Sequence, residues 1–353
     1  MTPFVYDGLP MRVMFGAGTL AKVRAEVERL GARRALVLTT PYQKAEGERV
    51  AALLGELSAG VFAGATMHTP THVTDAALAV LRESGAQCVV AIGGGSTTGL
   101  GKALALRTGV DQVVIPTTYA GSEMTPILGE TSEGAKTTRR DAAILPETVI
   151  YDVDLTLGLP VAMSGVSGIN AIAHAVEALY AENRNPIISM MAEEAIAALG
   201  RALPQIVAAP TDRAAREGAL YGAWLGGVCL GAVGMALHHK LCHTLGGMFD
   251  LPHAETHTIV LPHAVAYNTA AAPEAMAAIR RALGTGDAAR GLYDLAGKIG
   301  AKRALRDIGM PQDGIARAAE AAMKNPYFNP RPLEAAAIHG LIERAWRGDP
   351  PNV

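Results

Sequence analysis

"CVVAIGGGSTTGLGKALAL", residues 88–106, is the stretch that decides the fold. It starts as a short, branched, apolar run, passes through three glycines and continues with helical spacing. These features predict a buried parallel strand that turns tightly into a helix. Glycines at the start of a helix let a phosphate approach backbone N–H groups. The spacing is not GxGxxG, and a tight turn that needs positive φ would use the same glycines, so this signal alone is weak.

The same alternation extends on both sides of this stretch. "RALVLTT" (34–40) and "QVVIPTT" (112–118) also have the composition of buried strands, whereas "AEGERVAALLGEL" (45–57) and "THVTDAALAVLRESG" (71–85) have helical spacing. "AAILPETVIYDVDLTLGLP" (142–160) predicts a further strand and a turn. Alternating strands and helices predict a doubly wound, mostly parallel α/β sheet.

The character of the sequence changes near residue 161. Ala-rich runs with helical spacing follow, and none of them has the composition of a strand. A chain of 353 residues is too long for one hydrophobic core. We therefore expect an α/β nucleotide-binding domain over residues 1–160 and an all-helical domain over residues 161–353, with the active site in the cleft between them.

Composition excludes several classes of protein. The formal charge is −2 with no basic block, which argues against a nucleic-acid partner. Three cysteines without a CxxC pair predict neither a disulfide framework nor a zinc ribbon, so a reducing compartment is the simplest expectation. No secretory signal is visible, and the longest apolar stretch, 222–239, carries five glycines and ends on two histidines. We expect a cytoplasmic protein with no membrane partner.

Two small-residue loops follow adjacent predicted strands, and together they favour a dinucleotide at the carboxyl edge of the sheet. Thr39 and Thr40 end an earlier strand without a carboxylate that would repel a 2′-phosphate, so the cofactor is expected to be NADH or NADPH. The candidate cofactor-binding residues are Thr39, Gly94, Gly95, Ser96, Thr117, Thr118, Ser122 and Thr125.

Histidines are concentrated in the second half of the chain, where six of the ten lie between His238 and His263. Helical spacing places His239 and His243 on one face, and Asn170 and His174 on one face of another helix. His253 follows a Gly pair and a proline. These groups are expected to converge, whereas His238, His257 and His263 are expected to be ordinary histidines with local partners.

Several motifs give the chain a family resemblance. They are "GGGS" (93–96), "PTT" (116–118) before "GSE" (121–123), "NAIAH" (170–174), "HKLCH" (239–243) and "LPH" (251–253). Over nearly its whole length the chain resembles the iron-containing alcohol dehydrogenase superfamily, which implies the fold shared with dehydroquinate synthases. In metal-binding members an Asp and three histidines hold the metal. Those positions are Asn170, His174, His239 and His253 here, and His243 matches an extra histidine beside the reacting carbon.

Asn170 departs from the pattern of the superfamily. An amide in place of the Asp removes the anionic ligand, and Fe²⁺ favours a ligand set that includes a carboxylate. Three imidazoles could still hold Zn²⁺. We expect that metal is absent.

Longer stretches resemble the maleylacetate reductases within this superfamily. They are "GGGSTTGLGKALAL", "IPTTYAGSEMTPILGET", "GAKTT", "SGINAIAHAVEALYA" and "NPYFNPRP". The resemblance implies NAD(P)H-dependent reduction of maleylacetate, a small dicarboxylate, to 3-oxoadipate in the breakdown of aromatic compounds. It also implies a homodimer.

A mechanism without metal follows as a hypothesis. Hydride addition to the conjugated alkene creates an enolate, which hydrogen-bond donors can stabilise. His243 is the predicted proton donor, with His253 as the second choice, and His174, His239 and His253 would orient substrate oxygens together with Asn170. Lys136 is expected to contact the cofactor or a substrate carboxylate. Arg331 could clamp a carboxylate, although a loop arginine can equally cap a helix end.

Three alternatives stay open. One is a metal-dependent alcohol dehydrogenase in which Asn170 is still a ligand. Another is a metal- and NAD-dependent lyase or synthase, although the carboxylate-bearing metal set and the phosphate-binding basic residues of such enzymes are not found. The last is a non-catalytic nucleotide-binding module, which would leave the histidines unexplained.

Overall fold

The computed structural model describes residues 4–132 and 135–352 of the chain. The described residues form two compact units. One spans Leu9–Leu159, and the other comprises residues 160–352 together with residues 4–8. The sequence did not predict that the first described residues belong to the second unit.

The first unit is built on a six-stranded sheet with the order β1-β8-β5-β4-β2-β3, in which every neighbouring pair is parallel. Its strands are β1 (Arg12–Phe15), β2 (Ala35–Leu38), β3 (Ser58–Phe62), β4 (Cys88–Gly93), β5 (Asp111–Pro116) and β8 (Thr148–Tyr151). Because Gly93 and Pro116 are paired at the ends of β4 and β5, the loops after these two strands start side by side.

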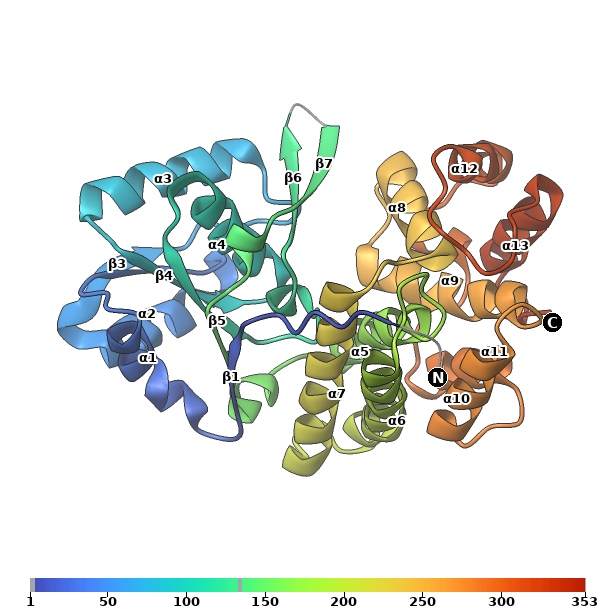
Figure 1. Ribbon diagram of the computed structural model, residues 1–353, viewed down its shortest axis with the longest axis horizontal. Helices are drawn as coiled ribbons and strands as arrows, with labels where there is room; N and C mark the ends of the chain where they lie inside the picture. Colours follow the sequence, from blue (N-terminus) through green and yellow to red (C-terminus); the bar gives the residue numbers. More distant parts are fainter. Residues whose placement is uncertain (1–3, 133–134, 353) are drawn as a thin grey trace. The chain divides into compact units, whose positions relative to one another are not determined.

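Alternate residues of β2, β4 and β5 enter two separate cores. Val37 and Val90 pack with α1 (Val23–Arg29) and α2 (Lys44–Leu54). Leu36 and Val89 pack on the opposite face with α3 (Thr71–Ser84) and α4 (Gly95–Thr108). The two helix pairs lie on opposite sides of the sheet (Figure 1). The predicted doubly wound α/β fold is therefore confirmed.

An antiparallel hairpin that the sequence did not predict joins β5 to β8. Its strands are β6 (Ile127–Ser132) and β7 (Ala135–Arg140), with Ile127 paired to Arg140 and Thr131 to Lys136. The side chain of Lys136, a predicted cofactor or substrate contact, lies outside the described residues.

The second unit is all-helical, as predicted: from residue 160 to residue 352 the structure contains no strand. Its helices are α5 (Val161–Ala178), α6 (Pro186–Ala208), α7 (Arg213–Ala232), α8 (Leu237–Phe249), α9 (His253–Asn268), α10 (Pro273–Leu283), α11 (Ala288–Lys298), α12 (Gly314–Met323) and α13 (Ala335–Arg347). Among the described helices none is by itself long and apolar enough to cross a membrane, and the one helix pair that passes by length and composition, α7 with α8, is bent by 93°.

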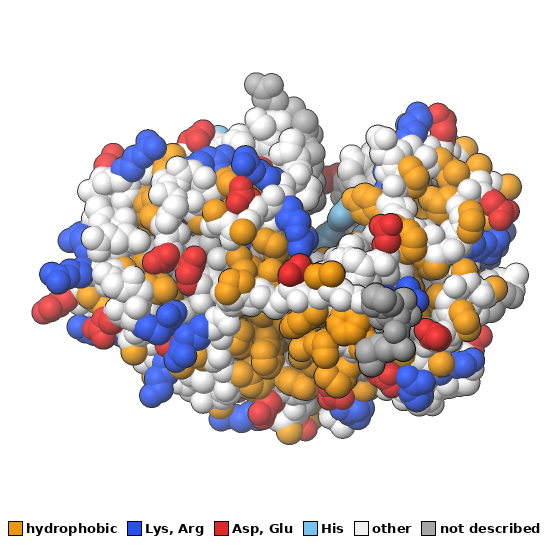
Figure 2. Space-filling view, in the orientation of Figure 1, with side chains coloured by type: hydrophobic (Ala, Val, Ile, Leu, Met, Phe, Trp, Pro, Cys, Tyr) orange, Lys and Arg blue, Asp and Glu red, His pale blue; other side chains and the backbone are white. Residues whose placement is uncertain are grey.

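Charges are mixed over the surface. On the face drawn in Figure 2, Lys and Arg side chains alternate with Asp and Glu, and no block of one sign stands out. This face agrees with the small net charge of the sequence.

Small residues let the helices α5, α6 and α7 approach closely. A Cβ added at Gly226 of α7 would lie 2.7 Å from the carbonyl oxygen of Ala171 on α5, next to Asn170. A Cβ at Gly168 of α5 would lie 2.5 Å from Leu203 Cδ2 on α6. The position of Asn170 therefore depends on a glycine at residue 226.

Gly226→Ala should destabilise the protein by about 1–3 kcal/mol, because the new methyl group meets a backbone oxygen that cannot move aside. Gly218→Ala on the same helix is the matched control. Its Cβ would lie 3.6 Å from Ala202 Cβ, an ordinary contact, so unfolding should be unchanged or stabilised by up to about 1 kcal/mol. Thermal unfolding followed by circular dichroism compares the two, and equal melting temperatures would contradict the packing argument.

Candidate active site

The turn after β4 is open to a ligand. Gly93 has a φ of 144°, which L-residues with side chains rarely adopt, and it leads through Gly94 into the first turn of α4. Gly95 is exposed, and a Cβ added there would meet no atom within 4 Å. The backbone N–H groups of Gly95 and Ser96 lie at the N-terminus of a 14-residue helix. This arrangement fits the pyrophosphate of a dinucleotide.

The neighbouring loops are tied together at this edge of the sheet. A Cβ on Gly94 would lie 3.1 Å from Thr118, so glycine allows the β4 and β5 loops to touch. Gln43 Nε2 donates to the hydroxyl of Thr117 at 3.1 Å. Thr39 is fully buried and donates to the carbonyl of Gln43 at 3.1 Å, whereas Thr40 is partly accessible. Gln43, which the sequence did not single out, thus links the ends of β2 and β5.

Ser122 and Thr125, two predicted cofactor ligands, contact a buried ammonium. Lys102 Nζ donates to the carbonyl of Ser122 at 2.5 Å, to Thr125 Oγ1 at 3.0 Å and to the carbonyl of Ile127 at 2.9 Å. Burial lowers the pKa of Lys102 to about 7, although the nearby Glu123 opposes the shift. Through these hydrogen bonds Lys102 holds the loop between β5 and β6 in place.

Histidines from three helices form one cluster in the second unit, which we call the histidine cluster: His174 on α5, His238, His239 and His243 on α8, and His253 and His257 on α9. The rings of His174 and His239 are stacked with centroids 5.2 Å apart. The ring of His257 lies 4.3 Å from that of His253 and 4.9 Å from that of His239. The predicted convergence of His174, His239, His243 and His253 within one unit is observed.

His257 belongs to this cluster, although the sequence predicted an ordinary histidine. It does have a local partner, since its Nδ1 lies 2.9 Å from Nε2 of His238. Its spacing of four residues from His253 was a signal that could have revealed it. For His263 the prediction was wrong, because both ring nitrogens are buried without a hydrogen-bond partner in the structure.

A buried carboxylate organises the cluster. Glu177 on α5 accepts hydrogen bonds from the backbone N–H of Ala236 at 2.8 Å and of His238 at 2.7 Å, at the start of α8. Its Oε2 also lies 2.6 Å from Nδ1 of His239. Glu177 thus caps α8 and fixes the ring of His239, which leaves Nε2 of that ring facing away from the carboxylate. It follows His174 by three residues on the same helical face, which was a second unused signal.

Burial divides the cluster into an exposed part, His243 and His253, which we call the rim, and a buried part, which we call the floor. His243 and His253 are exposed, whereas the other four rings are at most 3% exposed. Burial holds the pKa of His174 well below its usual value, and the neighbouring His239, His253 and His243 add to the shift. Burial likewise lowers the pKa of His238 and of His257. These three floor rings are therefore neutral near pH 7, and the rim rings are the ones that a substrate can reach.

The motif "NPYFNPRP" contributes a tyrosine and an arginine to the second unit. Tyr327 Oη lies 3.1 Å from Nδ1 of His243, and burial raises the pKa of the phenol, so that it stays protonated. The guanidinium of Arg331 lies 4.1 Å from the ring centroid of Tyr267, donates to its carbonyl and pairs with Glu334 at 3.6 Å. Those contacts hold the loop, and the carboxylate clamp stays a prediction.

The predicted metal ligands do not fit iron. Asn170 Oδ1, His174 Nδ1 and His239 Nε2 are buried without hydrogen-bond partners, but the set contains no anionic atom to neutralise Fe²⁺. The nearest carboxylate, Glu177, is engaged with α8 and His239. Among the described His, Cys, Asp and Glu side chains, metal-ligand spacing is met by His238, Cys242 and His257 instead.

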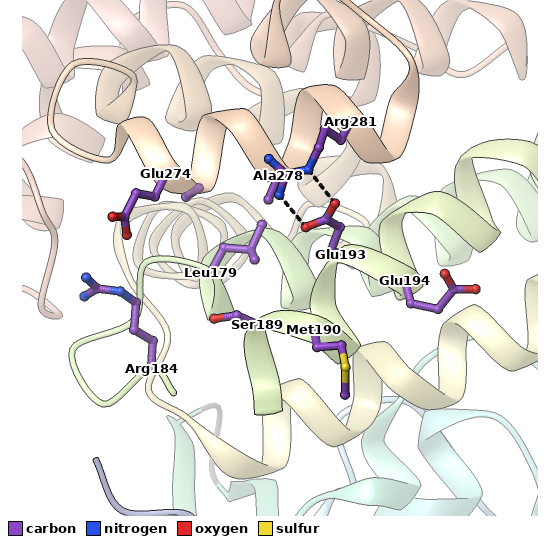
Figure 3. A pocket seen from close by; sticks show the side chains of 10 residues that line it. Leu179, Arg184, Ser189, Met190, Glu193, Glu194, Glu274, Ala278 and Arg281 are labelled. Atoms are coloured by element: carbon purple, nitrogen blue, oxygen red, sulfur yellow. Dashed lines mark hydrogen bonds and ion pairs between the residues drawn. The ribbon is translucent and has the colours of Figure 1, made fainter. Parts of the chain in front are cut away.

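A separate pocket of about 490 Å³ lies between α6 and α10. Arg281 donates to Glu193 across it at 2.9 and 2.7 Å, and Arg184 and Glu274 lie at its other end (Figure 3). None of the predicted site residues lines this pocket, so the candidate active site is assigned to the histidine cluster.

Comparison with known proteins identifies the family of the chain. The family described as "Iron-containing alcohol dehydrogenase" matches residues 10–153, and "Fe-containing alcohol dehydrogenase family, C-terminal" matches residues 164–346. The chain is 58% identical to a maleylacetate reductase of Sphingobium indicum over 99% of both chains, and 57% identical to one of a Rhizobium species over 100% of both. The crystal structure of maleylacetate reductase from Agrobacterium tumefaciens superposes with a TM-score of 0.97 at 58% identity, covering 99% of this chain and 100% of that one. The chain belongs to the iron-containing alcohol dehydrogenase family.

Proposed function

We propose that this chain is a maleylacetate reductase, an NAD(P)H-dependent oxidoreductase that reduces the conjugated C=C bond of maleylacetate to give 3-oxoadipate without a metal. Full-length relatives of that name at 52–58% identity support the assignment. We also propose that the enzyme is a cytoplasmic homodimer in the catabolism of aromatic compounds.

The observation that carries the proposal is the pair of accessible imidazoles beside a buried group of neutral imidazoles. The rings of His243 and His253 are stacked, with centroids 6.5 Å apart and 13° between their planes. Both are exposed to an incoming ligand. Imidazoles can donate hydrogen bonds to the carboxylates and the enolate oxygen of a reacting oxo-diacid. Reduction of an alkene needs such donors, but it creates no alkoxide that would require a Lewis acid.

The cofactor is assigned to the first unit. We propose that Gly94, Gly95 and Ser96 bind its pyrophosphate, and that the loops with Thr117 and Thr118 and with Thr39 line the remainder. Ser122 and Thr125 would shape the site through Lys102, and Lys136 would contact the cofactor or a substrate carboxylate. When bound, the reduced nicotinamide supplies the hydride. Because no carboxylate follows β2, either NADH or NADPH is accepted.

Tyr327 and His243 form the proposed proton donor. The 3.1 Å contact between Tyr327 Oη and His243 Nδ1 fits a phenol that donates and a ring that carries its hydrogen on Nε2. Hydride addition at the alkene carbon β to the ketone leaves an enolate, and Nε2–H of His243 donates to its oxygen. The α-carbon then takes the Nε2 proton of His243, and this exposed ring recovers a proton from water, which balances the reduction of the double bond. His253 orients the substrate directly, with Arg331 as a candidate clamp. His174, His239 and Asn170, which are buried, act on its orientation through the shape of the floor.

One observation favours a second candidate, a metal-dependent alcohol dehydrogenase. Asn170 Oδ1, His174 Nδ1 and His239 Nε2, three positions that match metal ligands of the family, are buried and have no hydrogen-bond partner. A divalent ion bound by three imidazoles would satisfy them.

Oxidation of NADH and NADPH by maleylacetate, measured with and without EDTA and alongside elemental analysis, tests the function. We expect turnover that EDTA does not change, from protein without stoichiometric iron or zinc. One tightly bound iron or zinc per chain with EDTA-sensitive turnover would support the alcohol dehydrogenase instead. Absence of maleylacetate-dependent oxidation with either cofactor would overturn the assignment.

His243→Asn should lower kcat by about 10²- to 10⁴-fold, because the proton donor is lost. NADH affinity, measured by fluorescence titration, should stay unchanged, since His243 lies in the unit that does not carry the glycine turn. His339→Asn on α13, also an exposed histidine, is the control and should keep full activity. Wild-type kcat in His243→Asn would remove this residue from the mechanism.

Tyr327→Phe should lower kcat about tenfold, which is the effect of losing one hydrogen bond of about 1.4 kcal/mol to His243. Steady-state kinetics should show no further loss when Tyr327→Phe is combined with His243→Asn, because the phenol acts through that ring. Tyr6→Phe, at another accessible tyrosine of the same unit, serves as the control. Fully additive losses in the double variant would mean that Tyr327 acts separately.

A further inference from the structure

Three side chains that the proposed mechanism does not use lie together at the base of the histidine cluster. His238 and Cys242 are one turn apart on α8, and His257 lies on α9. Their exposed fractions are 0%, 1% and 0%. One potential ligand atom from each lies within 4.8 Å of the others.

The distances are close to those of a three-coordinate metal. With metal–sulfur and metal–nitrogen bonds of about 2.3 and 2.0 Å, a planar trigonal site places sulfur and nitrogen about 3.7 Å apart and two nitrogens about 3.5 Å apart. Cys242 Sγ lies 3.7 Å from His238 Nε2 and 3.9 Å from Nδ1 of the same ring, so the sulfur is beside the ring and the imidazole must turn to direct its lone pair at an ion. His238 Nε2 and His257 Nδ1 lie 2.9 Å apart and share one hydrogen bond, so they would separate by about half an ångström.

The hydrogen bonds in the structure do not use the full hydrogen-bonding capacity of His238, Cys242 and His257. His257 Nε2 is buried without a hydrogen-bond partner, and the thiol faces an imidazole at a distance where a sulfur hydrogen bond is weak. Two imidazole lone pairs and a thiol sulfur form a soft ligand set, which selects thiophilic cations over Fe²⁺ or Mg²⁺.

Charge decides between the thiophilic cations. A divalent ion bound to one thiolate would leave an uncompensated positive charge in a fully buried position, which is costly. Copper(I) and one thiolate are together neutral. The negative charge of Glu177 acts on Cys242, but its oxygens are held by the backbone of α8 and by His239, so it is not free to bind a divalent ion directly. Copper(I) only replaces the thiol proton and so leaves the charge of the site unchanged.

We propose that His238, Cys242 and His257 form a binding site for copper(I), distinct from the metal position implied for the family at Asn170, His174, His239 and His253. Binding exchanges the thiol proton for the cation: Cu⁺ and Cys242–SH give Cys242–S–Cu and H⁺, with no change of oxidation state. The two imidazoles complete the trigonal site. This site does not depend on the proposed reductase activity.

Anaerobic titration of the full chain with copper(I), in competition with a chromophoric copper(I) chelator, tests the site. The wild-type protein should withdraw one copper(I) per chain and release one proton per ion. Cys242→Ser, which keeps the size but removes the thiolate, should weaken binding by at least about 100-fold. Cys229→Ser is the matched control, because Cys229 is equally buried but belongs to α7, and it should bind as the wild type does.

Two further outcomes separate this site from its alternatives. His253→Asn should retain the copper(I) stoichiometry, and its loss there would move the ion to the family's position. The proton release is measured on the wild-type protein, so the test survives even if Cys242→Ser folds poorly. No uptake from the competitor, or equal uptake by wild type and a folded Cys242→Ser, would overturn the proposal.

Discussion

The three contacts of the Glu177 carboxylate are the interaction on which the histidine cluster depends. The carboxylate belongs to the last turn of α5, yet it caps α8 and orients His239. Hydrogen bonds to an ionised group in a buried site contribute about 1.5–3 kcal/mol each. Without them the first turn of α8 would have buried N–H groups with no acceptor, and His239 would have no preferred tautomer. His243 lies one turn further along α8, so the cap that fixes the start of this helix also fixes the position of His243.

The neutral imidazoles of His174, His238 and His257 explain how the cluster packs closely without the family's anionic ligand. Desolvation keeps His174, His238 and His257 neutral, so close packing of the rings does not bring like charges together. An Asp at residue 170 would have added a buried charge that only a metal could balance. An amide there adds none. In the proposed function, N–H donors at the rim therefore stabilise the negative charge of the substrate carboxylates and of the enolate. The buried floor defines the shape of the site.

The fold could be predicted from the sequence to a large extent, because buried parallel strands are continuous apolar runs and the Ala-rich helices have clear spacing. The hairpin β6–β7 was missed, since "ILGETS" and "AKTTRR" are polar and carry no core pattern. Within the site, pairs four residues apart were recognisable, and Glu177 and His257 could have been found by extending the same rule. Gln43, Lys102 and Tyr327 could not, because their partners lie 20 or more residues away along the chain, at Thr117, Ser122 and His243.

The end of β2 has a consequence for the metabolism around such an enzyme. Thr39 is turned inward, and Thr40 and Gln43 present a hydroxyl and an amide where discriminating dehydrogenases place an acid. Under the proposed acceptance of either cofactor, a reductase with this edge would draw electrons from whichever nicotinamide pool the cell keeps more reduced. Carbon flux through the reaction would then follow the redox balance of the cell, and growth on an aromatic substrate would not be tied to one supply of reducing equivalents.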